Sequence, residues 1–330
     1  MASQARSMRL CEHPDFGDAI LRAAEHWRER GLRAAVIEKD YYVTEALREI
    51  ARAAGSHVIF KGGTSLSKGW GLIDRFSEDI DLFLDPDSFR PPLGTKGVDR
   101  ELKRLRDIVL KVPNLSHRKE ESATFGGSGR SDRFAYPQRF AGVGEVAARV
   151  LLESGIASGR QPTADRALTS LLATFLGEVG VSLQAEDEQP FSMKLLHFRR
   201  TFVEKLFAIH GKVEKQKRER TPLGSYARHY YDLYRLAGQP EVLAMLRSDE
   251  FPAIQRDYDS ISRRHFPRDY ACPQGMDFRH SDALFPKPPL RDELGAAYEE
   301  QCGQLCYGPW PSWREVLVRF EELRPLLGHS

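Results

Sequence analysis

The feature that most constrains this chain is a double glycine between a short apolar strand and a second strand that carries two aspartates. The apolar run at residues 58–60 predicts a strand that ends at Lys61. Gly62–Gly63 then allows a tight turn and a close approach of the backbone. Thr64 or Ser65 is expected to cap the helix that follows. The free N–H groups of that helix start, together with the two hydroxyls, would form a natural seat for a triphosphate.

The second strand places two carboxylates on one face. Because side chains alternate along a strand, Asp79 and Asp81 share a side while Ile80 and the leucines at 82 and 84 face a core. Carboxylate oxygens suit Mg²⁺, and in-line attack on a nucleotide α-phosphate is helped by two metal ions about 3.5–4 Å apart. Alone, either element is usually a plain turn or a strand end. Their combination in this order predicts a metal-dependent nucleotidyltransferase site.

Two predicted helices in the C-terminal half place a charged residue beside an apolar stripe. The first stripe consists of Phe198, Phe202, Leu206 and Ile209. Beside it, either the stem of Lys205 carries its ammonium out to water, or the ammonium faces a cleft and meets an anion. The second stripe consists of Tyr226, Tyr230 and Leu233. Asp232 borders this stripe, where a charged side chain is usually just solvated.

Four segments of the chain, in order, resemble the AbiEii/AbiGii-type nucleotidyltransferase toxin family, which includes mycobacterial toxins and lies within the DNA polymerase β-like superfamily. The segments are IEKDYYVTEALREI (37–50), KGGTSLSKGWGLIDRFSEDIDLFL (61–84), RRTFVEKLFAIHGK (199–212) and YARHYYDLYRL (226–236). A looser similarity follows in YGPWPSWREVLVRFEEL near the C-terminus. The resemblance therefore extends from about Ile37 to Leu236.

The resemblance implies an α/β fold, with a polymerase β-like nucleotidyltransferase core (a mixed sheet flanked by helices) followed by a mostly helical C-terminal domain. It adds Lys205 and Asp232 to the catalytic residues Asp79 and Asp81, with Lys205 at the nucleotide phosphates and Asp232 either positioning the nucleotide or acting as a base. Such sites often use a third metal-binding carboxylate from a neighbouring strand. Glu153, after the strand-like run at 150–152, is the best candidate, but an ordinary solvent-facing glutamate fits equally well. The nucleotide-binding candidates are Lys61, Gly62, Gly63, Thr64, Ser65 and Arg75.

The activity implied by the resemblance is that of a toxin in a toxin–antitoxin or phage-defence system. Such a toxin would transfer a nucleotide, with CTP or UTP favoured as donor and Mg²⁺ as cofactor, to the 3′ end of tRNA, and so block translation. A separately encoded antitoxin is the implied protein partner. Two alternatives remain: a small-molecule nucleotidyltransferase of the kind that modifies antibiotics, and a non-catalytic regulatory module on the same fold.

Length and composition agree with these expectations. A chain of 330 residues with 41% hydrophobic content suggests two domains, taken here as a catalytic part at 1–160 and a mostly helical part at 161–330. The absence of a long apolar stretch predicts a cytoplasmic protein without a membrane span, and we expect a monomer. The four cysteines are too sparse for a disulfide framework, so free thiols are expected. Residues 122–138, rich in Gly, Ser and Arg, predict a mobile loop near the mouth of the cleft.

Basic residues concentrate in the stretch 194–220 around Lys205. Besides Lys194 and Lys205, they are Arg199, Arg200, Lys212, Lys215, Lys217, Arg218 and Arg220, against Glu204, Glu214 and Glu219. Such a run is either a solvated helix face or a track for nucleic-acid phosphates. Histidine and tyrosine side chains in and after this stretch could stack on single-stranded nucleotides, although aromatics at helical spacing more often belong to a core.

Overall fold

The computed structural model describes residues 8–77, 79–141, 147–268, 270 and 272–328. Contacts divide the described chain into two compact units, the first within 1–69, 76–156 and 164–195, and the second within 70–75, 157–163 and 196–330. Segment 164–195 lies beyond the expected boundary after residue 160 and yet belongs to the first unit. Its strands pair into the sheet of that unit, which explains why the division is not a single cut in the sequence.

The first unit is built on a mixed sheet. Its strands are β1 (Val58–Lys61), β2 (Asp79–Leu84), β3 (Ser116–His117), β4 (Ala123–Phe125), β5 (Gly129–Ala135), β6 (Arg149–Gly155), β7 (Thr163–Leu168) and β8 (Phe191–Leu196). They are ordered β3-β5-β6-β2-β1-β8-β7, with β4 beside β5. Neighbours β1–β2 and β5–β6 are antiparallel, whereas β2–β6 and β1–β8 are parallel. The expected mixed sheet is therefore confirmed.

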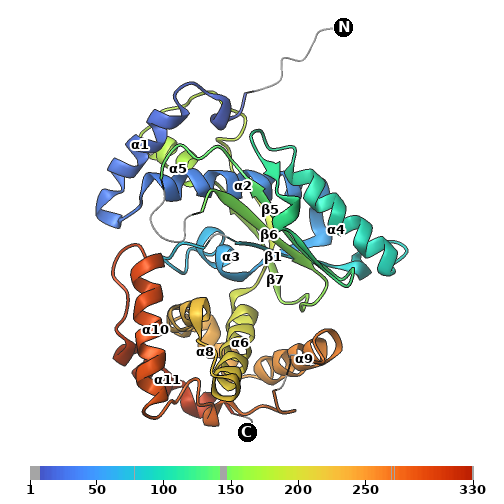
Figure 1. Ribbon diagram of the computed structural model, residues 1–330, viewed down its shortest axis with the longest axis vertical. Coiled ribbons are helices and arrows are strands. Elements are labelled where there is room, and N and C mark those ends of the chain that lie inside the picture. Colours follow the sequence, from blue (N-terminus) through green and yellow to red (C-terminus); the bar gives the residue numbers. More distant parts are fainter. Residues whose placement is uncertain (1–7, 78, 142–146, 269, 271, 329–330) are drawn as a thin grey trace. The chain divides into compact units, whose positions relative to one another are not determined.

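Helices flank this sheet, as expected for an α/β fold (Figure 1). They are α1 (Phe16–His26), α2 (Ala34–Ala54), α3 (Gly62–Lys68), α4 (Thr95–Val109) and α5 (Leu171–Glu178). Helix α2 contains the expected helix at 37–50 and is the central one, because α1, α4, α5 and β6 all pack against it. Its side chains Ile37, Leu47 and Ile50 are consequently fully buried.

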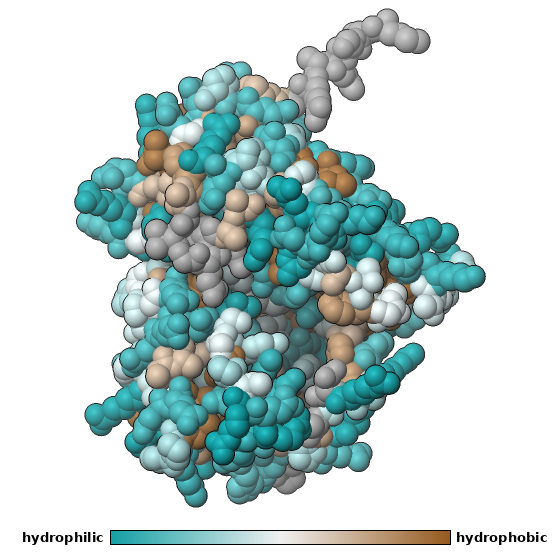
Figure 2. Space-filling model, in the orientation of Figure 1, coloured by the Kyte–Doolittle hydropathy of each residue, from teal (hydrophilic) through white to brown (hydrophobic). Residues whose placement is uncertain are grey.

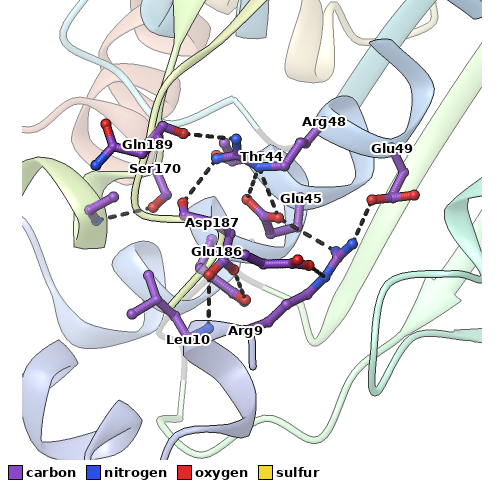
Figure 3. Close-up of polar contacts among 12 residues, drawn as sticks. Arg9, Leu10, Thr44, Glu45, Arg48, Glu49, Ser170, Glu186, Asp187 and Gln189 are labelled. Carbon is purple, nitrogen blue, oxygen red and sulfur yellow. Dashed lines mark hydrogen bonds and ion pairs between the residues drawn. The ribbon is translucent and has the colours of Figure 1, made fainter. Parts of the chain in front are cut away.

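A buried polar network ties the N-terminal segment to α2 and to the segment before β8 (Figure 3). The guanidinium of Arg9 contacts Glu49 at 2.5 Å and Glu186 at 3.1 Å. Arg48 forms an ion pair with Glu45 at 2.9 Å, and its guanidinium also donates to the backbone oxygen of Asp187 at 2.9 Å. Burial makes each of these groups depend on its partner, because an unpaired charge away from water is costly.

The prediction of a mobile loop at 122–138 is wrong, since most of this segment forms β4 and β5. The turn between the two strands uses Gly126 and Gly127, whose φ angles are 55° and 73°. Strand β5 has few apolar residues because its polar ones satisfy each other within the sheet. Arg130 donates to both carboxylate oxygens of Asp132 at 2.9 Å, and Asp132 is fully buried. Polar composition therefore concealed a paired strand.

The second unit is mostly helical, as expected. Its helices are α6 (Phe198–Glu219), α7 (Arg228–Ala237), α8 (Pro240–Leu246), α9 (Glu250–His265), α10 (Leu290–Leu305) and α11 (Trp313–Leu323). The predicted stripe on α6 is buried along its length. The stripe on α7 holds for Tyr230 and Leu233 but not for Tyr226, which is 37% exposed and lies in the short turn before the helix. Asp232 is fully buried instead of bordering the stripe.

Hydrophobic residues on the face seen in Figure 2 form small, separate patches among hydrophilic ones. Among the described residues, no helix is long and apolar enough to cross a membrane. All four cysteines are free thiols, as expected.

Candidate active site

Three carboxylates lie on one face of the sheet in the first unit. Asp79 and Asp81 occupy alternate, half-buried positions of β2, and Ile80 between them is fully buried. Glu153 on β6 is paired with Asp81 in parallel register, so it points to the same face. Strand β1 lies along the opposite edge of β2 from β6, and its Lys61 is also paired with Asp81. The predicted strand and its alternation are confirmed, and Glu153 does come from a neighbouring strand.

Gly62 brings the backbone against one of these carboxylates. Its φ of 76° lies in the left-handed region, which favours glycine. A Cβ at this position would lie 1.9 Å from Oδ2 of Asp81. Both the turn and the position of Asp81 therefore require that residue 62 has no side chain, which explains the first glycine of the pair.

Thr64 and Ser65 do not cap α3, contrary to the sequence-based expectation. The helix begins at Gly62 with Lys61 as its N-cap, because Gly62 already turns the chain. Both hydroxyls are used inside the protein: Oγ1 of Thr64 donates to the backbone oxygen of Asp79 at 2.6 Å, and Oγ of Ser65 donates to that of Gly62 at 2.9 Å. Thr64 thus fastens α3 to the start of β2, where the first aspartate lies.

The electrostatics of this face favour a cation. Glu153 is an exposed residue, as the alternative of a solvent-facing glutamate requires. Its pKa is nevertheless raised to about 7, first because neighbouring atoms partly shield its carboxyl from water, and then because Asp81 and Asp79 repel its charge. Lys61 and Arg133 offset only part of this effect. A positive ion beside the three carboxylates would relieve their repulsion.

The donor chemistry fits Mg²⁺ held by Asp79 and Asp81. Protein-bound Mg²⁺ usually takes one or two carboxylates together with substrate phosphates and water, not a cage made wholly of protein ligands. Among the residues the structure describes, no three His, Cys, Asp or Glu side chains are arranged to hold a metal ion by themselves. The two aspartates therefore fit as the protein's share of a metal site that the substrate completes, with Glu153 beside them in register.

A second cluster of predicted residues lies in the second unit. Asp232 on α7 accepts two hydrogen bonds from the guanidinium of Arg75, at 2.7 and 2.8 Å. The ammonium of Lys205 on α6 contacts the same carboxylate at 2.8 Å and Nδ1 of His229 at 3.1 Å. Lys205 and Arg75 are only 6% and 2% exposed, so neither charge is carried out to water. Lys205 therefore does not carry its ammonium out to water; the anion that it meets is the carboxylate of Asp232, and its contact with nucleotide phosphates stays a prediction.

Opposite charges fix the protonation states in this cluster. Burial alone would raise the pKa of Asp232, but the charges of Arg75 and Lys205 outweigh it and hold that pKa well below its usual value. Burial lowers the pKa of Lys205, and the charge of Asp232 opposes this effect. Burial, followed by the charge of Lys205, lowers the pKa of His229 to about 3. His229 is therefore neutral near pH 7, with Nδ1 accepting a hydrogen bond from the lysine.

The predicted residues thus form two groups, one in each unit. Lys61, Gly62, Asp79, Asp81 and Glu153 come together on the sheet, and Arg75, Lys205 and Asp232 come together on the helices. The sequence reasoning missed His229 as a member of the second group. Its position three residues before Asp232, one turn along the same helix, was the available signal.

Comparison with known proteins finds a family and a similar solved structure. The model of the family described as "Nucleotidyl transferase AbiEii toxin, Type IV TA system" matches residues 45–317. The chain is similar to the solved structure of MenT4, nucleotidyltransferase toxin Rv2826c from Mycobacterium tuberculosis H37Rv, with 14% identity and a TM-score of 0.49, covering 94% of this chain and 99% of that one. No curated protein matches the chain.

Proposed function

The chain belongs to the AbiEii family of nucleotidyl transferase toxins of type IV toxin–antitoxin systems, and on this basis we propose that it transfers a nucleotide from an NTP to the 3′ end of tRNA. The observation that carries the proposal is the alignment of Asp79, Asp81 and Glu153 on one face of the sheet. The family supports the reaction class, and the acceptor, donor and cofactor are our inference.

In this proposal Asp79 and Asp81 hold Mg²⁺ and Glu153 is the third carboxylate. When bound, the metal would lower the pKa of the attacking hydroxyl and offset the charge of the leaving pyrophosphate. Gly62 keeps space for the carboxylate of Asp81, and Thr64 holds the backbone of Asp79 in place. The chain itself thus contributes two carboxylates in fixed positions. Gly62 leaves room for that of Asp81, and the hydroxyl of Thr64 holds the backbone beside that of Asp79.

The donor nucleotide, CTP or UTP in this proposal, would lie along the turn at Gly62–Gly63. Lys61, Thr64, Ser65 and Arg75 remain the other candidates for contacting it. The structure modifies what Thr64 and Ser65 can contribute, because their hydroxyls already bond to the backbone. The backbone N–H groups of the first helical turn, at Gly62, Gly63 and Thr64, are therefore the better candidates for the phosphates.

The second cluster is proposed to serve the same reaction. Arg75 lies four residues before Asp79 in the sequence and forms an ion pair with Asp232. Lys205, held by the same carboxylate, would bind the nucleotide phosphates. Because Asp232 accepts from both cations and has a depressed pKa, we favour its role as a positioning residue over that of a base.

At the cellular level, we propose a cytoplasmic, monomeric toxin that blocks translation and takes part in phage defence. Its family implies a cognate antitoxin as partner. The basic stretch on α6 favours a nucleic-acid acceptor over a small antibiotic-like acceptor. The three aligned carboxylates favour catalysis over a non-catalytic regulatory role, because a module that only binds has no need of a metal site.

Labelled NTPs test the proposal directly. Each of the four α-³²P NTPs is incubated with the protein, Mg²⁺ and either total tRNA or a panel of small hydroxyl-bearing acceptors. We expect label on tRNA, most from CTP or UTP, and none with EDTA. Label found only on small molecules would overturn the tRNA acceptor and leave the reaction class intact.

Asp81→Asn serves as the catalytic control, because it keeps the shape of the side chain and removes its charge. We expect it to abolish both transfer and growth inhibition on expression. Growth inhibition that survives Asp81→Asn would favour the non-catalytic alternative. Sequencing of tRNA 3′ ends after brief induction would identify the nucleotide and the tRNAs.

A further inference from the structure

A groove in the second unit lies between the C-terminal half of α6 and α9, and we call it the α6–α9 groove. Its volume is about 470 Å³, and its lining includes Lys212, Lys215, Arg218, Tyr226, Phe266 and Arg268. The residues of the Arg75, Lys205 and Asp232 cluster do not line it. A volume of this size is typical of a site for a small molecule or a single nucleotide unit, not of a surface for a duplex.

The groove carries an excess of positive charge. Lys212, Lys215 and Arg218 recur every three residues along α6, so they lie on successive turns of one helix face. Glu219 pairs with Arg218 at 2.8 Å and with Lys215 at 3.6 Å. Glu214, the other acidic residue of the lining, pairs with Lys217 outside the groove at 2.9 Å.

Two cations of the groove keep their charge available for a ligand. Within the described part of the chain, no carboxylate lies within ion-pair distance of Lys212 or Arg268. Lys212 instead lies over the ring of Tyr226, with its nitrogen 4.0 Å from the ring centre. Arg268 is exposed on the other wall of the groove. An anionic ligand would therefore meet a cation on each wall.

Aromatic rings line the same groove as these cations. Phe266 is 48% exposed and Tyr226 is 37% exposed, although large aromatic side chains are usually buried. Deeper in the groove, Tyr258 stacks on Phe207 with ring centres 4.6 Å apart. Exposed rings among basic side chains are the arrangement by which proteins bind single-stranded nucleic acid, with bases on the rings and phosphates on the cations.

We propose that the α6–α9 groove binds unpaired nucleotides of the RNA acceptor, through residues distinct from those assigned to catalysis. The inference rests on the proposed function for the identity of the RNA, while the groove itself is argued from its charge and rings. An acidic peptide would use the cations but has no flat groups to cover Phe266 and Tyr226. Unpaired RNA would contact both, because its phosphates can pair with the cations and its bases can stack on the two rings.

The test measures binding of a fluorescent, unstructured RNA of about 10 nucleotides by anisotropy, a length within the range of single-stranded sites. The groove variant is Lys212→Glu with Arg268→Glu. The matched control is Arg22→Glu with Lys96→Glu, which changes net charge equally at exposed positions of the first unit. We expect the groove variant to weaken binding by about tenfold or more, and the salt slope to fall by about 0.7 for each phosphate that is no longer neutralised. The control should bind nearly as the wild type does.

Phe266→Ala separates stacking from charge. We expect it to weaken RNA binding without changing the salt slope, because every cation that neutralises a phosphate is still present. Equal losses of affinity in the groove and control variants would overturn the proposal. So would competition by polyglutamate as strong as that by unlabelled RNA, which would indicate an acidic peptide site.

Transfer assays keep this proposal apart from the proposed function. If the wild type labels tRNA and the groove variant retains its KM for tRNA, the groove assignment is wrong while the function stands. If the wild type labels no RNA but the groove variant still loses RNA binding selectively, the function is wrong while the groove stands.

Discussion

At the scale of single residues, Gly62 shows how a turn and a functional group depend on each other. Its positive φ permits the chain to leave β1 and enter α3 at once, and its missing side chain leaves room for the carboxylate of Asp81. A residue with a side chain that adopted this positive φ would still displace Asp81, because its Cβ would occupy the space of the carboxylate. The two requirements can be separated by mutation.

We expect Gly62→Ala to abolish nucleotide transfer, because its Cβ would push the carboxylate of Asp81 from its place. Gly126→Ala is the matched control, since Gly126 also has a positive φ but a Cβ there would meet nothing within 4 Å. In urea denaturation both variants should lose about 1 kcal/mol of stability from backbone strain, and Gly62→Ala should lose more because Asp81 must move to admit the Cβ. Only Gly62→Ala should lose activity, and equal activity in the two variants would contradict the steric role of Gly62.

The buried cluster on α7 predicts unequal effects for its two partners. Asp232→Asn leaves Arg75 and Lys205 buried without their counter-charge, so we expect it to lower the free energy of unfolding by about 3–5 kcal/mol. Lys205→Met should cost less, because Arg75 still satisfies Asp232 with two hydrogen bonds. Urea denaturation of both variants checks this ordering, and the reverse ordering would show that Arg75 does not hold the carboxylate.

At the scale of elements, α3 and β2 are joined by one buried hydroxyl. Oγ1 of Thr64 bonds to the backbone oxygen of Asp79, and Thr64 is only 1% exposed. The bond links the turn that carries the glycines to the strand that carries the aspartates. Its removal should therefore affect both stability and the position of the aspartates proposed to bind the metal.

Thr64→Val removes this hydrogen bond while keeping the shape of the side chain. We expect it to cost about 1–3 kcal/mol of stability, because the backbone oxygen of Asp79 loses a buried partner. It should also reduce nucleotide transfer. Thr64→Ser keeps the hydroxyl and should recover most of the activity; failure of the serine variant to do so would point to the missing methyl group instead.

Glu45 of α2 gives the polar network in Figure 3 a dependence on pH, and its carboxylate pairs with Arg48 of the same helix and with Arg9. Burial raises the pKa of Glu45 to about 7, against the opposing charge of Arg48. The folded chain therefore holds this proton more readily than the unfolded chain does. The stability that this proton contributes is fully present below about pH 4.5 and is lost as the pH rises through about 7.

Glu45→Gln removes this titration. We measure the free energy of unfolding of both proteins by urea denaturation at about pH 5 and at about pH 7.5. We expect the wild-type value minus the variant value to be smaller at the higher pH. Other groups titrate in both proteins and cancel in the difference. A difference that stays constant, or grows with pH, would contradict the raised pKa.

The elements predicted from sequence were those with a strong local signal. Alternation and the glycine pair were enough to place β1, β2 and their aspartates, because the pattern depends on neighbouring residues alone. Strand β5 was missed because its buried charges, Arg130 and Asp132, satisfy each other, so the strand shows no apolar alternation. Burial of Asp232 was missed because its partner Arg75 lies 157 residues away, where no local pattern can reveal it.

At the scale of the whole molecule, the chain passes between its two units five times, because six segments alternate between them. Within the first unit, Phe60 of β1 pairs with Leu195 of β8, although most of the sheet's other strands lie between these two in the sequence. A single boundary after residue 160, as expected from the sequence, would have allowed each half to fold alone. The observed pairing does not.

We therefore expect a fragment of residues 1–160 to lack a cooperative unfolding transition in circular dichroism. It would lose β7, α5 and β8, and with them one of the two partner strands of β1 and the segment that holds Arg48. The full chain is the control. A fragment that unfolds cooperatively would show that the first unit does not need residues 164–195.

The alternation of the two units also sets an order of events during synthesis. The ribosome releases β1 and β2 early, but the sheet waits for β8, and residues 70–75 wait for helices that are made last. The aspartates thus exist in the nascent chain long before the fold that positions them. A cell that makes this protein therefore meets the folded site only after β8 and the helices of the second unit have been synthesised.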